Sequence, residues 1–142
     1  MINDYLQCLC RVLQVDLPTL KTDDVLLTPT MIAYLDPGTN VLHVKRNVSD
    51  QRDTFFAVAH ELRHAWQAKY APDLYLTDYH PVTSSGDRVA YNLQPAEIDA
   101  NAFASVIMTK LFRARPLFDG MPDEVITAIE KRSATLLDEI RL

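Results

Sequence analysis

The chain has 142 residues, of which 48% are hydrophobic and 23% are charged, and its formal net charge is −5. This length predicts one domain, spanning residues 1–142, with a single core. The acidic balance argues against a nucleic-acid-binding surface and leaves no polybasic patch for a membrane, and the sequence has neither an apolar run of 18 residues nor a signal-peptide pattern.

The amino-terminal region predicts an amphipathic packing helix from Asp4 to Val15, where apolar residues recur at helical spacing. Either Asn3 or Asp4 is the candidate N-cap of this helix. Cys8 and Cys10 are the only cysteines, and a spacing of two points them to different faces of that helix. We therefore expect two reduced thiols and a cytoplasmic location.

A polar connection is predicted from Thr19 to Thr28, with a short strand or turn at Val25–Leu27. After it, the β-prone runs Met31–Leu35 and Val41–Lys45 flank a turn-forming sequence and predict a hairpin. His43 alternates with the core residues of the second strand, so it is expected to be an exposed strand residue and not a ligand.

The run Phe55–Tyr70 predicts a buried helix because it is apolar on almost every side, with one polar stripe of His60, His64 and Gln67. Within it, residues 60–64 form a His-Glu-x-x-His motif. Histidines four residues apart lie on one helix face, with Cβ atoms ~5–6 Å apart, and can bind one Zn²⁺. Glu61 is turned about 100° from His60 and is placed to act as general base on a metal-bound water.

The alternative for this motif is a pair of hydrogen-bonded core histidines. Burial of imidazoles without partners is costly, and a metal would satisfy both rings at once, so the metal site is the preferred interpretation.

The boundaries of this helix are predicted from capping residues and from Pro72, which ends it. Asn47 or Ser49 is the expected N-cap. The segment from Asp73 to Asn92 has the composition of a long loop, and such loops are usually functional. Its candidates for stabilising an oxyanion are Tyr75, Tyr79, His80 and Tyr91.

Gln94–Ala104 opens a second buried helix that runs to about Arg113, with Pro95 at its first position. Glu97, Asn101 and Ser105 form its polar stripe, so the two buried helices should face each other through their stripes. A catalytic zinc takes three protein ligands plus water, and Glu97 is the expected third ligand. The alternative role for Glu97 is the carboxylate of a capping box, although Gln94 is a weak N-cap.

Two other polar residues of this helix have open roles. Asp99 lies on another face from Glu97 and is expected to be a surface charge, or else an acceptor for a histidine N–H. Asn101 could brace the carboxylate or the base, or make a plain buried hydrogen bond. A last packing helix is predicted from Pro122 to Arg141.

The first motif, with the later sequence Glu97-Ile98-Asp99-Ala100-Asn101-Ala102-Phe103-Ala104, resembles the small gluzincin metallopeptidases of the ImmA/IrrE type. In that family the glutamate of E-x-x-A-N-x-F-A is the third zinc ligand, and it falls on Glu97. The resemblance implies a zincin-like α+β domain in which a small β-sheet packs on the active-site helix, beside the glutamate helix and two terminal packing helices. It also implies an edge strand that pairs with extended peptide.

The expected function is therefore zinc-dependent hydrolysis of a protein or peptide substrate, with Glu61 as general base. Arg63 replaces the usual small residue of the family motif, and the separation of the two motifs is longer than expected. Two alternatives are an SprT-like protease with His80 as third ligand and a latent or non-catalytic zinc-binding module that binds peptides. The metzincin pattern is excluded, because Gln67 stands in place of its glycine and Tyr70 in place of its third histidine.

Overall fold

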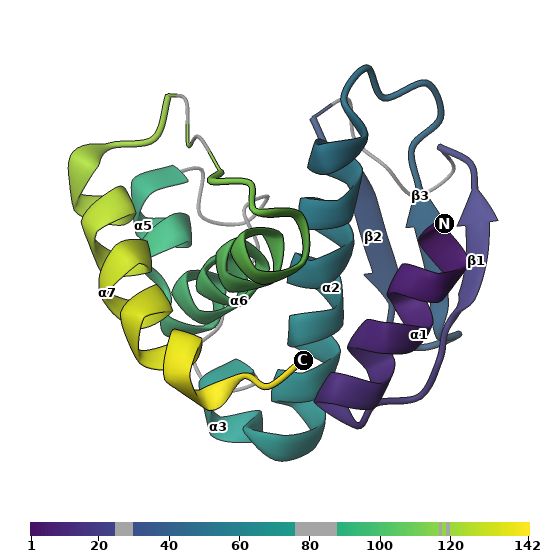
Figure 1. Ribbon diagram of the computed structural model, residues 1–142, viewed down its shortest axis with the longest axis horizontal. Coiled ribbons are helices and arrows are strands. Elements are labelled where there is room, and N and C mark those ends of the chain that lie inside the picture. The colour runs from purple at the N-terminus through teal and green to yellow at the C-terminus, as the bar shows by residue number, and fades with distance from the viewer. Residues whose placement is uncertain (25–29, 76–87, 117, 119) are drawn as a thin grey trace.

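The computed structural model describes residues 1–24, 30–75, 88–116, 118 and 120–142. The described part of the chain is α+β, with six helices and one three-stranded mixed sheet. Helix α2 (Gln51–Tyr70) is the central element, and it contacts α1, β2, α3 and α6. Figure 1 shows the sheet and α1 (Ile2–Leu13) on one side of α2, and α5 (Arg88–Leu93), α6 (Pro95–Phe112) and α7 (Asp123–Glu139) on the other.

The sheet contains β1 (Thr19–Thr22), β2 (Ala33–Asp36) and β3 (Val41–Val44) in the order β1-β3-β2. β2 and β3 form the predicted hairpin, an antiparallel pair with Leu35 opposite Leu42. Asn40 closes its turn by donating its N–H to the carbonyl of Asp36 over 2.8 Å. Asn40 has a φ of 53°, a conformation that asparagine tolerates better than most residues.

The expectation of a polar connection from Thr19 to Thr28 is wrong for its first four residues, which form strand β1. This strand pairs in parallel with β3, and its side chains are mostly exposed. Backbone pairing alone holds such a strand at the edge of a sheet, so its polar side chains carry no signal of hydrophobic alternation. The segment predicted at Val25–Leu27 lies outside the described residues.

The expectation that His43 is exposed is also wrong, because only 7% of its surface is accessible to solvent. Its Nδ1 lies 2.8 Å from the carboxylate oxygen Oδ1 of Asp23, just after β1. β3 is the central strand, and the Asp23 carboxylate that follows β1 gives one nitrogen of the buried ring a partner. The expectation that His43 does not belong to the candidate metal group agrees with this position.

The N-cap of α2 is not one of the residues predicted for this role. Asp50 is the N-cap, and its carboxylate accepts from the backbone N–H of Arg52 over 2.9 Å, so neither Asn47 nor Ser49 has this role. The helix ends at Tyr70, and α3 (Pro72–Tyr75) follows directly. Within the segment expected to be a loop, Asp73 to Asn92, residues 73–75 belong to α3 and residues 88–92 belong to α5, so the expectation is wrong for these residues.

Helix α6 is buried on almost all sides between α2 and α7, as its predicted apolar surface requires. Ala100, Ala102 and Ala104 are completely buried, and their small side chains let the neighbouring helices approach closely. Helix α7 packs through Val125, Ile129 and Leu136, which confirms the predicted packing helix. No helix in the described ranges is both long enough and apolar enough to cross a lipid bilayer.

Candidate metal centre

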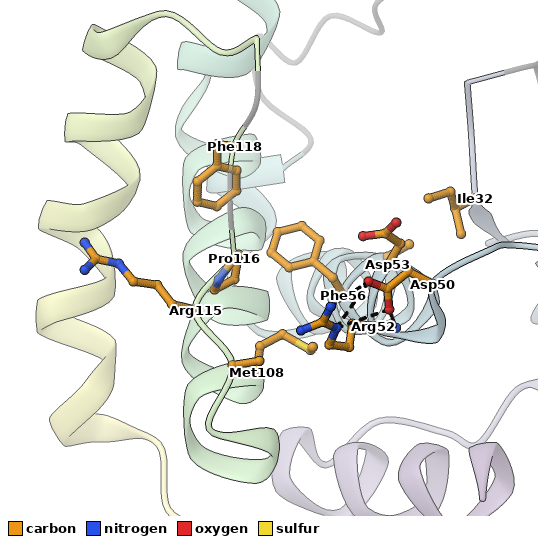
Figure 2. Close-up of a pocket in the computed structure, with 11 residues that line it drawn as sticks. Ile32, Asp50, Arg52, Asp53, Phe56, Met108, Arg115, Pro116 and Phe118 are labelled. Atoms are coloured by element: carbon orange, nitrogen blue, oxygen red, sulfur yellow. Dashed lines mark hydrogen bonds and ion pairs between the residues drawn. The ribbon is translucent and has the colours of Figure 1, made fainter.

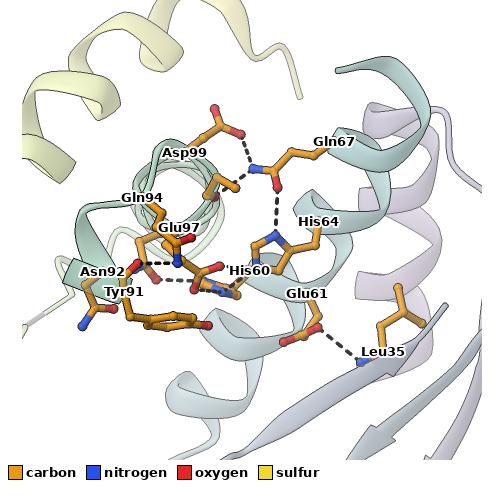
Figure 3. A network of polar contacts seen from close by, with 12 residues as sticks. Leu35, His60, Glu61, His64, Gln67, Tyr91, Asn92, Gln94, Glu97 and Asp99 are labelled. Carbon is orange, nitrogen blue, oxygen red and sulfur yellow. Dashed lines mark hydrogen bonds and ion pairs between the residues drawn. The ribbon is translucent and has the colours of Figure 1, made fainter. Parts of the chain in front are cut away.

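The predicted contact between the two polar stripes is present, and it brings His60 and His64 of α2 to Glu97 of α6 (Figure 3). Nε2 of His64 lies 2.8 Å from one carboxylate oxygen of Glu97, and Nε2 of His60 lies 3.4 Å from the other. The two Nε2 atoms are 3.1 Å apart. Glu97 has only 2% of its surface exposed, so its carboxylate meets the two rings in a buried environment.

The other nitrogen of each imidazole is held by an amide. Nδ1 of His60 lies 2.8 Å from Oδ1 of Asn101, one helical turn after Glu97. Nδ1 of His64 lies 2.8 Å from Oε1 of Gln67, on its own helix. An amide oxygen only accepts, so each Nδ1 donates and each Nε2 is directed at the centre of the group. Asn101 therefore contacts a histidine, and not the carboxylate or the base.

This group of side chains fits a metal ion. The ligand atoms of His60, His64 and Glu97 all lie within 4.8 Å of one another. Bonds of about 2.0–2.1 Å in tetrahedral geometry place pairs of ligand atoms about 3.3 Å apart, and the two Nε2 atoms, which are 3.1 Å apart, lie close to that value. Two imidazoles that present Nε2 toward a buried carboxylate can thus hold a cation, while the geometry leaves its identity open.

Glu61 lies beside this group and faces the sheet. Its Oε2 accepts a hydrogen bond from the backbone N–H of Leu35 in β2 over 3.3 Å. The carbonyls of Ile32 and Asp36 bond toward β3, and the backbone groups of a strand alternate in direction, so those of Leu35 face the open edge of the sheet. Glu61 therefore lies beside the metal group and contacts the edge of β2 that no other strand among the described residues pairs with.

The ionisable groups of the site have displaced pKa values with opposite signs. Burial raises the pKa of Glu61 and outweighs the charges of His64 and His60, which lower it. The negative charge of Glu97 adds to the increase. Burial would also raise the pKa of Glu97, but hydrogen bonds from His60 and His64 and their charges hold it well below its ordinary value. For His64, burial lowers the pKa, but the hydrogen bond and charge of Glu97 outweigh it and raise the value to about 9.

Asp99 is buried and is not a surface charge, since only 2% of its surface is exposed. Its carboxylate accepts hydrogen bonds from Arg63 of α2, Arg132 of α7 and Gln67, not from a histidine. Burial opposes ionisation, but these hydrogen bonds, led by that of Arg63, hold the pKa of Asp99 below its ordinary value. Arg63, which lies inside the His-Glu-x-x-His motif, is thus one of two arginines that pair with the buried Asp99.

The candidates for an oxyanion donor are placed only in part. Tyr91 belongs to α5, and Figure 3 draws its ring in the same view as the metal group, while its carbonyl accepts from Gln94 Nε2 over 3.1 Å. Tyr75 is the last residue of α3. Tyr79 and His80 lie outside the described residues.

A cavity of about 380 Å³ opens next to the amino-terminal half of α2. Ala57, Phe56, Met108 and Phe118 form apolar parts of its wall, with Ile32 just before β2 (Figure 2). Ala57 lies three residues before His60, which places it on the same face of α2. The cavity therefore lies about one helical turn from the metal group.

Three features of the site were not predicted from the sequence. Gln67 was recognised only as part of a polar stripe, and neither Arg132 nor the backbone N–H of Leu35 carries a sequence signal, because each reaches the site through a contact between distant segments.

A scan against protein-family models and searches of curated proteins and of solved structures found no match to this chain.

Proposed function

We propose that the protein is a metal-dependent peptidase with a zincin-like fold, similar to the small gluzincins. The observation that carries this proposal is the convergence of His60, His64 and Glu97, with Glu61 beside them at an open strand edge. Two imidazoles and one carboxylate with a neighbouring glutamate base make zinc the metal of choice. A purely structural zinc is disfavoured, since such sites use four Cys or His ligands.

When bound, a zinc ion supplies Lewis acidity, which polarises the scissile carbonyl and makes water more acidic. Glu61 accepts a proton from the attacking water and passes it to the leaving nitrogen as the C–N bond breaks. The products are a carboxylate and an amine. The raised pKa of Glu61 suits this role, because a base that also returns the proton works best with a pKa near the working pH.

The proposed binding site for the peptide backbone is the outer edge of β2, which no other strand in the described part of the chain pairs with. Ala33 and Leu35 direct backbone N–H and C=O groups to that edge, and an extended peptide pairs with such groups by adding a strand. This pairing brings the scissile bond to Glu61, which already contacts the N–H of Leu35. The cavity beside Phe56 and Met108 then lies where a side chain of the peptide would be placed.

The geometry supports Glu97 as the third ligand, and His80, the alternative, lies outside the described residues. A capping role is less consistent with the structure, because the Glu97 carboxylate contacts the two imidazoles and no side-chain cap is formed at Gln94. A latent enzyme or a binding module without activity would share this metal group, so activity has to be tested separately from metal content.

The test measures metal content by mass spectrometry and cleavage of an unfolded protein such as casein, with all variants purified identically without chelator. We expect zinc and activity in wild type, zinc without activity in Glu61→Gln, and neither in Glu97→Ala. His80→Ala should keep its zinc. Full activity in Glu61→Gln, or loss of zinc in His80→Ala alone, would overturn the proposal, and zinc without cleavage in wild type would favour the binding module.

A further inference from the structure

The strongest unassigned feature lies behind the metal group, where the buried Asp99 joins three helices. Arg63 donates to it from α2 over 2.7 and 3.1 Å, and Arg132 donates from α7 over 2.9 and 3.0 Å. Two guanidinium groups offset the cost of burying this carboxylate, which would be high for an isolated charge. Arg63 is itself buried and lies over the ring of Trp66, with its Cζ 3.7 Å from the ring centroid.

Asp99 determines the orientation of the Gln67 side chain. The Gln67 amide nitrogen donates to Oδ2 of Asp99 over 2.8 Å and to the carbonyl of Ala96 over 2.9 Å. Both partners are acceptors, so a reversed amide would set its oxygen against a carboxylate and a carbonyl. The buried amide therefore has only one favourable orientation, with Oε1 directed at His64.

The fixed amide in turn determines the orientation of His64. Oε1 of Gln67 accepts from Nδ1 of His64 over 2.8 Å, so this nitrogen keeps its hydrogen. Nε2 is then the nitrogen that faces Glu97 and His60. Partners behind a ligand histidine commonly fix the ring orientation and tautomer that a metal needs.

We propose that Asp99, anchored by Arg63 and Arg132, is a positioning residue that acts through Gln67 to hold His64 with Nε2 toward the metal site. The inference rests on the proposed metal function and extends it to α7, which contributes Arg132. It also gives a role to Arg63, since the arginine inside the motif neutralises the carboxylate on which the histidine orientation depends.

The first measurement is nuclear magnetic resonance of the His64 Nδ1–H proton in chelator-treated protein, which does not require metal binding. We expect a slowly exchanging signal in wild type. Gln67→Met has nearly the same size but no amide acceptor, so the signal should be lost or should exchange faster. A folded Gln67→Met protein with the wild-type signal would overturn the proposal.

The second measurement is zinc affinity, by competition with a chromogenic chelator. Gln67→Met should bind zinc about 10–100-fold more weakly, which is the usual effect of removing a partner behind a ligand histidine. Arg132→Met should weaken binding by a smaller factor, because Arg63 still holds Asp99. Arg115→Met is the matched control: it removes an exposed arginine that pairs with Glu130 of α7 over 3.9 Å, and affinity should not change.

A pair of charge-changing substitutions protects the test against simple misfolding. Gln67→Glu sets a second carboxylate against Asp99 and should weaken zinc binding. When Asp99→Asn is added, the new amide at position 99 can donate a hydrogen bond to the carboxylate introduced at position 67. Zinc affinity should then recover by at least about tenfold over Gln67→Glu alone. Absence of recovery in a folded double variant contradicts the positioning role. If wild type binds no zinc while its His64 Nδ1–H is protected from exchange, the proposed metal-dependent function is rejected. The contacts from Asp99 through Gln67 to His64 are then still supported.

Discussion

Glu61 and Glu97 belong to the same site but have pKa shifts of opposite sign, because their neighbours differ. Glu97 accepts from both imidazoles, which stabilise its charge despite burial. Glu61 has one backbone donor, the N–H of Leu35, and burial dominates its pKa. Two carboxylates with opposite shifts suit the two proposed roles, a charged ligand and a base that can hold a proton. This division was assigned from the motif, and the surroundings of each residue give it a physical cause.

Cys10 provides a prediction of pH dependence outside the site. Burial, with a smaller contribution from the charge of Asp16, raises the pKa of its thiol to about 11. Between pH 9 and 11 the unfolded chain ionises at Cys10 while the folded protein keeps the thiol neutral, so the free energy of unfolding should fall as the pH rises. The Cys10 contribution to this fall is at most about 1.4 kcal/mol per pH unit, and urea denaturation at pH 8, 9, 10 and 11 measures it.

Other groups also titrate in this range, so the comparison is between variants. Cys10→Ala should show a shallower fall above pH 9 than wild type, whereas Cys8→Ala keeps Cys10 and should retain its contribution. Parallel curves for wild type and Cys10→Ala would show that the buried thiol is not the group responsible.

Between the elements, a buried hydrogen bond from a tyrosine hydroxyl of α1 stabilises the packing of α1 against α2. Tyr5 donates to the carbonyl of Phe55 over 2.6 Å, and the two rings pack edge to face with centroids 4.8 Å apart. Tyr5→Phe keeps the ring contact and removes only the hydrogen bond, so the free energy of unfolding should fall by about 0.5–1.5 kcal/mol. Urea denaturation monitored by circular dichroism measures this change.

Tyr70→Phe is the matched control, because Tyr70 also donates to a backbone carbonyl, that of Gln14, over 2.8 Å. Tyr70 is 46% exposed, so water replaces the lost bond and the change in stability should be smaller. Equal losses in the two variants would contradict the argument from burial.

The elements that could be predicted from sequence are those whose side chains carry a strong pattern. The sequence predicts α2 and α6 to be apolar nearly all round, each with one polar stripe, and the structure confirms their mutual contact and the burial of α6. Helix α2 is buried at only six of its 20 positions. Strand β1 lacked such a pattern, because pairing with β3 fixes it through backbone bonds. The buried position of His43 was missed for the same reason, since its partner Asp23 follows a strand that was not foreseen.

The same limit applies to the site. His60, Glu61, His64 and Glu97 were proposed from two local motifs, and the structure brings them together. Asp99 was misplaced at the surface because its partners Arg63 and Arg132 come from two other helices. Helical spacing shows which residues share a face, but it does not show which distant side chain meets them.

For the molecule as a whole, the position of α2 decides what a metal would do to stability. Figure 1 shows α2 between the sheet with α1 and the group formed by α5, α6 and α7. His60 and His64 lie on α2, and Glu97 lies at the start of α6. A metal held by all three therefore connects the two main buried helices across their contact. Its binding free energy should stabilise the whole fold, because unfolding separates the ligands.

Zinc should accordingly raise the unfolding temperature of wild type, and a chelator should reverse the increase. At a free zinc concentration a hundredfold above Kd, the stabilisation is about 2.7 kcal/mol, measured by calorimetry with and without zinc. Glu61→Gln should keep the increase, because Glu61 is not a ligand, whereas Glu97→Ala should lose most of it. An equal increase in wild type and Glu97→Ala would place the bound zinc elsewhere on the protein, and no increase in wild type would contradict the assignment of the three residues as a metal site.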